Sequence, residues 1–173
     1  MKIGIMADTH DNLPNIKKAV NIFNQEKIDL LFHAGDFVSP FTARELKKIQ
    51  CPFTGVFGNN DGDRLFLLNQ FQKIGPIYPE PYKTNIDGKK IIIFHKNDVI
   101  AELAKSQLYD VIIYGHTHHK DLYKEGKTTV INPGECGGWL TGKSTIAILE
   151  LTDLSVRIIN LSALISNRAN NVV

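Results

Sequence analysis

The 173-residue sequence predicts an α/β fold, with strands and helices alternating at first and strands alone toward the end. Short β-branched or aromatic runs are each followed by a polar turn and then by apolar residues at helical spacing, which is typical of βαβ units. After Asp121 the helical spacing stops, and short strand-like runs separated by turn residues take its place. A third observation concerns function, because residue types that bind metals follow five of the expected strands.

Three strand–helix pairs are expected in the first part of the chain. The first helix would place Leu13, Ile16, Val20 and Phe23 on one face, the face that packs against a sheet. Pro14 suits the first turn of this helix, because no hydrogen bond within a helix needs the N–H that proline lacks. The expected strands are residues 2–7, 29–33 and 53–57, and the expected helices are residues 13–25, 40–49 and 64–73.

The pattern breaks at residues 75–81, where three prolines indicate a connecting loop. The alternation then resumes with Asp87-Gly88, a dipeptide that favours a tight hairpin turn between two strands. The hairpin strands are expected at residues 84–86 and 90–94, followed by a helix at 98–107 and a strand at 110–114.

The last part of the chain predicts antiparallel strands joined by turns at Gly126 and Asp153. These strands are expected at residues 122–124, 129–131, 145–149 and 156–159. The length suits one well-buried core, so we expect a single domain at residues 1–161. The polar, asparagine-rich residues 162–173 are expected to form a tail or an added short helix.

Composition argues against several classes of protein: those that bind nucleic acid or membrane surfaces, those held by disulfides and those with membrane spans. Lys and Arg total 20 and Asp and Glu total 18, a formal charge of +2, so no patch for nucleic acid or a membrane surface is expected. Cys51 and Cys136 form no CxxC pair, so both are expected to be free thiols. The apolar amino terminus meets Asp8 before it reaches the length of a signal core, and no apolar run approaches about 18 residues. The chain is therefore expected to be cytoplasmic.

Residues that bind metals follow five expected strands directly. Because the carboxyl ends of parallel strands open onto one edge of a sheet, these side chains are expected to converge there. Each cluster is weak alone, but two carboxylates, one amide oxygen and four imidazoles together suit Mn²⁺, Fe²⁺, Ni²⁺ or Zn²⁺ better than Ca²⁺. The candidate metal ligands are Asp8, His10, Asp36, Asn59, His95, His116 and His118.

In order and spacing, these clusters resemble the calcineurin-like metallophosphoesterases, and among them the small archaeal and bacterial phosphodiesterases related to the retromer scaffold subunit. The resemblance runs from Asp8 to about Leu161 and rests on D-x-H, G-D, G-N-x-D, a lone histidine after a strand, G-H-x-H and Asn-Pro-Gly at 132–134. It implies a four-layer αββα sandwich of two mixed sheets flanked by helices, which agrees with the α/β pattern described above.

The resemblance also implies a centre with two divalent ions, for which Mn²⁺ is preferred over Ni²⁺, Fe²⁺, Zn²⁺ or Mg²⁺. One ion would be held by Asp8, His10 and His118, the other by Asn59, His95 and His116, and Asp36 would bridge the two. Solvent bound between two such ions is acidified toward neutral pH. The implied function is a phosphodiesterase in which a metal-bridging hydroxide attacks a phosphate ester.

The candidate catalytic groups are residues next to predicted ligands in the sequence. They are Asn60 and Asp61, which follow Asn59, and Lys96, which follows His95. In many family members a histidine that protonates the leaving group or steadies the phosphate stands where this chain has Asn60. An amide is no general acid, and losing such a group costs about 10²–10⁴ in rate, so we expect a preference for good leaving groups. Asp61 would hold Asn60 or the loop backbone. Lys96 and His119 are alternative proton donors, although both are also typical of a solvated rim.

Other polar residues near these motifs have simpler explanations. His33 is expected to be a hydrogen-bonded core residue, and Asp11 and Asn12 are expected to cap a helix. Trp139 fits the core, a substrate wall or a partner surface equally well.

Two alternatives to the phosphodiesterase remain open. A phosphomonoesterase would use the same ligands, and a non-catalytic interaction scaffold has the same fold in the retromer subunit but lacks the full ligand set. All seven positions carry competent donors here, which favours an enzyme. The expected partner is a small phosphodiester or nucleotide-like substrate, and a homo-oligomer is compatible with the sequence.

Overall fold

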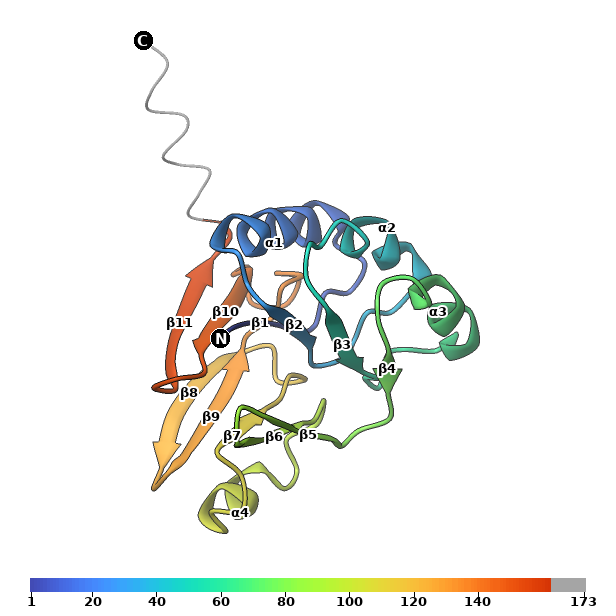
Figure 1. Ribbon diagram of the computed structural model, residues 1–173. Coiled ribbons are helices and arrows are strands. Elements are labelled where there is room, and N and C mark those ends of the chain that lie inside the picture. Colours follow the sequence, from blue (N-terminus) through green and yellow to red (C-terminus); the bar gives the residue numbers. More distant parts are fainter. Residues whose placement is uncertain (163–173) are drawn as a thin grey trace.

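The structure, a computed structural model, describes residues 1–162, so most of the expected tail at 162–173 lies outside the described residues. Two β-sheets pack face to face, with helices on both outer sides (Figure 1). The strands are β1 (Lys2–Met6), β2 (Leu30–His33), β3 (Phe53–Val56), β4 (Ile77–Tyr78), β5 (Tyr82–Ile86), β6 (Lys89–Ile93), β7 (Val111–Ile113), β8 (Lys120–Glu125), β9 (Thr128–Pro133), β10 (Thr145–Glu150) and β11 (Ser155–Asn160). The helices are α1 (Leu13–Glu26), the 3₁₀ turn η1 (Pro40–Thr42), α2 (Ala43–Leu46), α3 (Arg64–Phe71) and α4 (Ile100–Lys105).

Both sheets are mixed. The larger has the strand order β11-β10-β1-β2-β3-β4, in which β1 to β4 run parallel to one another. The smaller has the order β5-β6-β7-β9-β8, in which β6, β7 and β9 run parallel. Together with the helices outside each sheet, this arrangement confirms the αββα sandwich that the sequence resemblance implied.

The buried apolar side chains form three layers, one between the two sheets and one on the outer face of each sheet. In β6, Ile91 and Ile93 point between the two sheets, whereas Ile92 packs against α4. In β1, Ile3 and Ile5 also enter the space between the sheets. Because successive side chains of a strand face opposite ways, a strand covered on both sides is apolar throughout.

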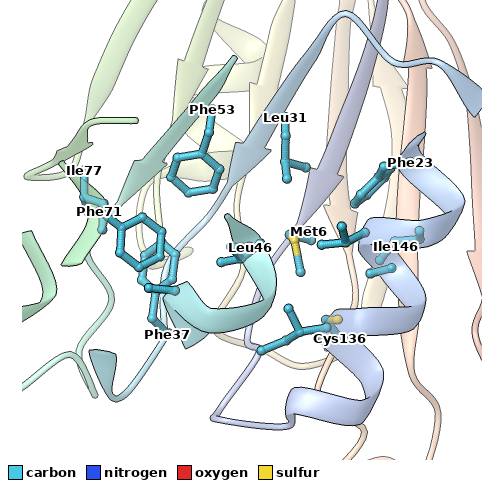
Figure 2. Packing of buried hydrophobic residues seen from close by; sticks show 14 of the residues in the cluster. Met6, Phe23, Leu31, Phe37, Leu46, Phe53, Phe71, Ile77, Cys136 and Ile146 are labelled. Atoms are coloured by element: carbon cyan, nitrogen blue, oxygen red, sulfur yellow. The ribbon is translucent and has the colours of Figure 1, made fainter. Parts of the chain in front are cut away.

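The outer face of the larger sheet carries the aromatic part of the core (Figure 2). Phe71 of α3 packs on Phe37 and Phe53, with ring centroids 5.2 and 5.4 Å apart. Phe23 of α1 covers Gly4 of β1, where a Cβ atom would lie 2.8 Å from the phenylalanine ring. The absence of a side chain at Gly4 therefore lets α1 lie close to the sheet.

Several expectations need adjustment. The single helix expected at 40–49 is divided into η1 and α2, and the loop expected at 75–81 contains the short strand β4. The four strands expected after Asp121 do not form one antiparallel sheet. β8 and β9 join the smaller sheet, and β10 and β11 join the larger.

The expected hairpin is confirmed: β5 and β6 pair across Asp87 and Gly88, whose φ angles of 48° and 78° suit a tight hairpin turn. None of the helices within residues 1–162 is long and apolar enough to cross a membrane. Cys51 and Cys136 are free thiols, and Cys136 is buried.

Candidate metal centre

The predicted ligands lie where the carboxyl ends of strands from both sheets meet. The loops after β1, β2 and β3 come from the larger sheet, and those after β6 and β7 come from the smaller. Hydrogen bonds join the loops across the sheets: His95 Nδ1 lies 2.9 Å from the Ala34 carbonyl, and His116 N donates to both carboxylate oxygens of Asp8. The residues were expected at one edge of one sheet, but two sheets contribute to the centre.

Four of the seven residues form one compact group: Asp8, His10, Asp36 and His118 each offer a ligand atom, and these atoms lie within 4.8 Å of one another. Asp8 and Asp36 are fully buried. His10 Nε2 is also buried and makes no well-directed hydrogen bond among the described residues, although it lies 3.3 Å from Asp36 Oδ2. A buried ring nitrogen without a partner beside two carboxylates fits a cation.

The remaining three predicted ligands are linked to Asp36 through His95. His95 Nε2 is 3.4 Å from Asp36 Oδ2 and 2.8 Å from Asn59 Oδ1, and the His116 ring centroid is 5.1 Å from that of His95. The Ala34 carbonyl can only accept, so His95 Nδ1 carries a proton and Nε2 faces two oxygen acceptors. A cation between these atoms would satisfy all of them at once.

The backbone at this centre is held in an uncommon conformation. Residues other than glycine rarely adopt a positive φ, and such residues cluster at functional sites. Five of the seven predicted ligands do so here, with φ angles between 39° and 66°: Asp8, His10, Asp36, His116 and His118. Strain at these positions, supported by the surrounding sheets, aims the side chains inward.

Burial and the close charges shift the pKa values of the two aspartates in opposite directions. Burial raises the pKa of Asp8 to about 6, and the neighbouring histidines offset this only in part. Burial also acts to raise the pKa of Asp36, but contacts with His10 and His95 outweigh it and hold that pKa well below its usual range. Asp36 is therefore an anion among histidines.

Of the candidate catalytic residues, Asn60 and Asp61 have clear contacts. Asn60 donates to both oxygens of Asp36, from its backbone N at 2.8 Å and from Nδ2 at 2.7 Å. Asp61 is buried and accepts from the backbone N of Gly58 and of Val38, both at 2.7 Å. Asp61 thus holds the loop backbone, whereas Lys96 is exposed at the rim.

Sequence reasoning missed Glu135. This residue was noted only as part of a turn, yet its buried carboxylate accepts from His118 Nδ1 at 3.0 Å and from the backbone of Trp139 and Leu140. Burial acts to raise the pKa of Glu135, but its hydrogen bonds with His118 and Thr141 outweigh it and lower that pKa to about 2. An ionised Glu135 keeps the proton of His118 on Nδ1, which leaves Nε2 free toward Asp8.

His33, Asp11 and Asn12 were expected to have structural roles, and the structure shows the contacts of each. His33 is buried, accepts from Gly35 N and contacts Thr9 Oγ1, and burial lowers its pKa to about 3, so it is a neutral core residue as expected. Asn12 caps α1 by accepting from the backbone of this helix at Asn15, whereas Asp11 binds Ser39 instead of capping the helix. The expectation for Asp11 was wrong.

Trp139 lies on the rim. Its side chain is 64% exposed, and its Nε1 donates to the His10 carbonyl at 2.9 Å. It is therefore not a core residue.

Comparisons with known proteins agree with this geometry. The sequence profile of the calcineurin-like phosphoesterase superfamily domain matches residues 1–154. The chain belongs to this superfamily. It is 46% identical over 154 residues to a phosphodiesterase of Methanocaldococcus jannaschii, an alignment that covers 87% of this chain and 93% of that protein.

Solved structures of other proteins have the same fold. A structure described as a novel archaeal phosphodiesterase superposes with a TM-score of 0.86 at 44% identity, covering 92% of this chain and 99% of the other. Vps29 of Entamoeba histolytica, solved with Zn²⁺, superposes with a TM-score of 0.66 at 16% identity, covering 93% and 99%. The second likeness shows the fold alone.

Proposed function

We propose that this calcineurin-like phosphoesterase is a metal-dependent phosphodiesterase with a dinuclear centre. The observation that carries the proposal is the compact group of Asp8, His10, Asp36 and His118, in which the buried His10 Nε2 makes no well-directed hydrogen bond, with His95 Nε2 3.4 Å from Asp36. The identity of 46% to an archaeal phosphodiesterase over most of both chains supports it. A scaffold that works through its surface needs no such donor set, so the enzyme is favoured over that alternative.

Two groups of residues would hold the ions. Asp8, His10 and His118 would bind one ion, Asn59, His95 and His116 the other, and Asp36 both. Bound divalent ions supply water acidified toward neutral pH and charge to match a phosphate ester. We propose Mn²⁺ as the preferred metal, because the donors mix carboxylate and amide oxygens with imidazole.

The protein residues have separate tasks in this proposal. Glu135 orients His118 and fixes its tautomer, and Asn60 orients Asp36 through two hydrogen bonds. Neither Asn60 nor the buried Asp61 is placed to protonate a leaving group, since an amide is no acid and both Asp61 oxygens accept backbone hydrogen bonds. Substrates whose leaving group departs as an anion therefore suit this centre.

The test is hydrolysis of bis-p-nitrophenyl phosphate by metal-free protein and after addition of Mn²⁺, Ni²⁺, Zn²⁺ or Mg²⁺, with p-nitrophenyl phosphate as the monoester. We expect metal-dependent turnover with the diester preferred. Asp36→Asn should abolish it, and the matched control Asp98→Asn, at an exposed aspartate outside the centre, should not. No turnover with any metal would exclude the enzyme, and a preference for the monoester would favour the phosphomonoesterase.

A further inference from the structure

A groove of about 360 Å³ adjoins the candidate metal centre. His118 forms part of its wall and also belongs to the group of ligand atoms around Asp8 and Asp36. The loop after β9 contributes Thr141 and Lys143, and the start of β8 contributes Lys120. A molecule bound at the metals can therefore extend along His118 into this groove.

The charged side chains that line the groove are of one sign. Lys120 and Lys143 line it, and none of the lining residues within 1–162 is acidic. The nearest buried acid, Glu135, is occupied by hydrogen bonds from His118, Trp139, Leu140 and Thr141. The whole chain carries a formal charge of only +2, so two lysines facing one hollow are a local feature.

Both lysines are attached to ordered backbone. Lys120 pairs with Pro133 at the first position of β8. Lys143 N donates to Thr141 Oγ1 at 3.1 Å, and Thr141 Oγ1 donates to Glu135 Oε1 at 2.7 Å. The wall that carries Lys143 is thus joined through Glu135 to His118, and groove and centre keep a fixed relation to each other.

We infer that this groove binds a second phosphate of the substrate, apart from the phosphate ester that is cleaved. The inference rests on the proposed function for the position of the cleaved phosphate, and it defines the substrate class as phosphodiesters that bear another phosphate. Two ammonium groups suit a terminal phosphate, which carries up to two negative charges near neutral pH. Thr141 and His119 supply further polar contacts in the groove.

Binding is the decisive measurement, because it does not depend on turnover. Calorimetry with Mn²⁺-loaded protein would compare thymidine 3′,5′-bisphosphate with thymidine 5′-monophosphate, which differ only in the second phosphate. We expect the bisphosphate to bind about tenfold more tightly, an advantage that falls with added salt. In the double variant Lys120→Gln/Lys143→Gln the advantage should shrink to about twofold or less.

The control is Lys124→Gln/Lys127→Gln, at exposed lysines toward the other end of the β8–β9 hairpin, which should keep the full advantage. Equal binding of the two nucleotides by the unaltered protein, or an advantage that survives loss of Lys120 and Lys143, would overturn the inference. Turnover of the p-nitrophenyl ester of thymidine 5′-phosphate tests the proposed function separately. If the protein cleaves this ester but binds the bisphosphate and the monophosphate equally, the inference about the groove is wrong and the proposed phosphodiesterase function stands.

Discussion

Asn60 places an amide, not an acid, beside Asp36. Its side chain is tied to Asp36 and has no proton to give as an acid. We predict that turnover of diesters falls steeply as the leaving alcohol becomes less acidic, and that Asn60→His raises the rate with alkyl leaving groups by up to about 10²-fold. Rates with p-nitrophenyl esters should change little, because p-nitrophenolate departs without a proton.

The measurement is a series of aryl and alkyl diesters with both proteins at saturating Mn²⁺. Asn60→Ala removes the amide without adding an acid, so it should keep the steep dependence on the leaving group. If Asn60→His and Asn60→Ala show the same dependence, position 60 has no part in proton transfer.

Glu135 contacts the proposed metal ligand His118 and would act on a bound metal through it. Replacement by Gln keeps the shape but removes the charge and one acceptor, so His118 Nδ1 and the backbone donors of residues 139–141 compete for a single oxygen. We predict that Glu135→Gln weakens Mn²⁺ binding about 10–100-fold.

Trp139 is the only tryptophan and donates to the His10 carbonyl, so its fluorescence offers a direct titration of the metal. Glu80→Gln is a comparison next to another proposed ligand, because Glu80 accepts from the backbone of His95 and Lys96. It should weaken Mn²⁺ binding less than Glu135→Gln does. Unchanged Mn²⁺ affinity in Glu135→Gln would show that this carboxylate only supports its loop.

At the scale of elements, the loops after β2 and β3 touch at Gly58. A Cβ atom there would lie 2.1 Å from Asp36 Oδ1 and 2.3 Å from Asp36 N. We predict that Gly58→Ala displaces Asp36 and lowers kcat/KM by about 10²-fold, because small misplacements of catalytic groups have effects of that size.

Gly62, in the same loop, has open space around it, so Gly62→Ala is the matched control and should retain activity. Activity and Mn²⁺ affinity measured on both variants test whether a side chain at position 58 displaces Asp36. Equal losses in the two would mean that the loop responds to any added methyl group.

The elements show how far the sequence could predict the molecule. The hairpin at Asp87-Gly88 and the αββα layers were predictable, because turn chemistry and apolar alternation are local signals and the motif order resembles a known family. The strand β4 was missed, because it has two residues in a proline-rich stretch. Residue type and order predicted seven donors, and four of them, Asp8, His10, Asp36 and His118, lie in one compact group. The contact between Glu135 and His118 depends on tertiary folding across 17 positions, which no local pattern contains.

At the scale of the whole molecule, the centre lies on the seam between the two sheets. Asp8 and Asp36 come from the larger sheet and His95 from the smaller, and all three are fully buried. Cations bound there would offset the burial of charge and connect both halves of the sandwich. Metal binding should therefore raise the stability of the entire fold.

We predict that Mn²⁺ at about 100 times its dissociation constant adds about 2.7 kcal/mol to the free energy of unfolding. For a chain of this length that corresponds to a rise in Tm of about 5–10 °C over protein in EDTA. Thermal unfolding followed by circular dichroism measures it. The double variant His116→Ala/His118→Ala should lose most of the rise, because each proposed ion loses a ligand. A Tm that does not respond to metal, in protein that binds Mn²⁺ by fluorescence, would mean that the unfolded chain binds the metal as well as the folded one does.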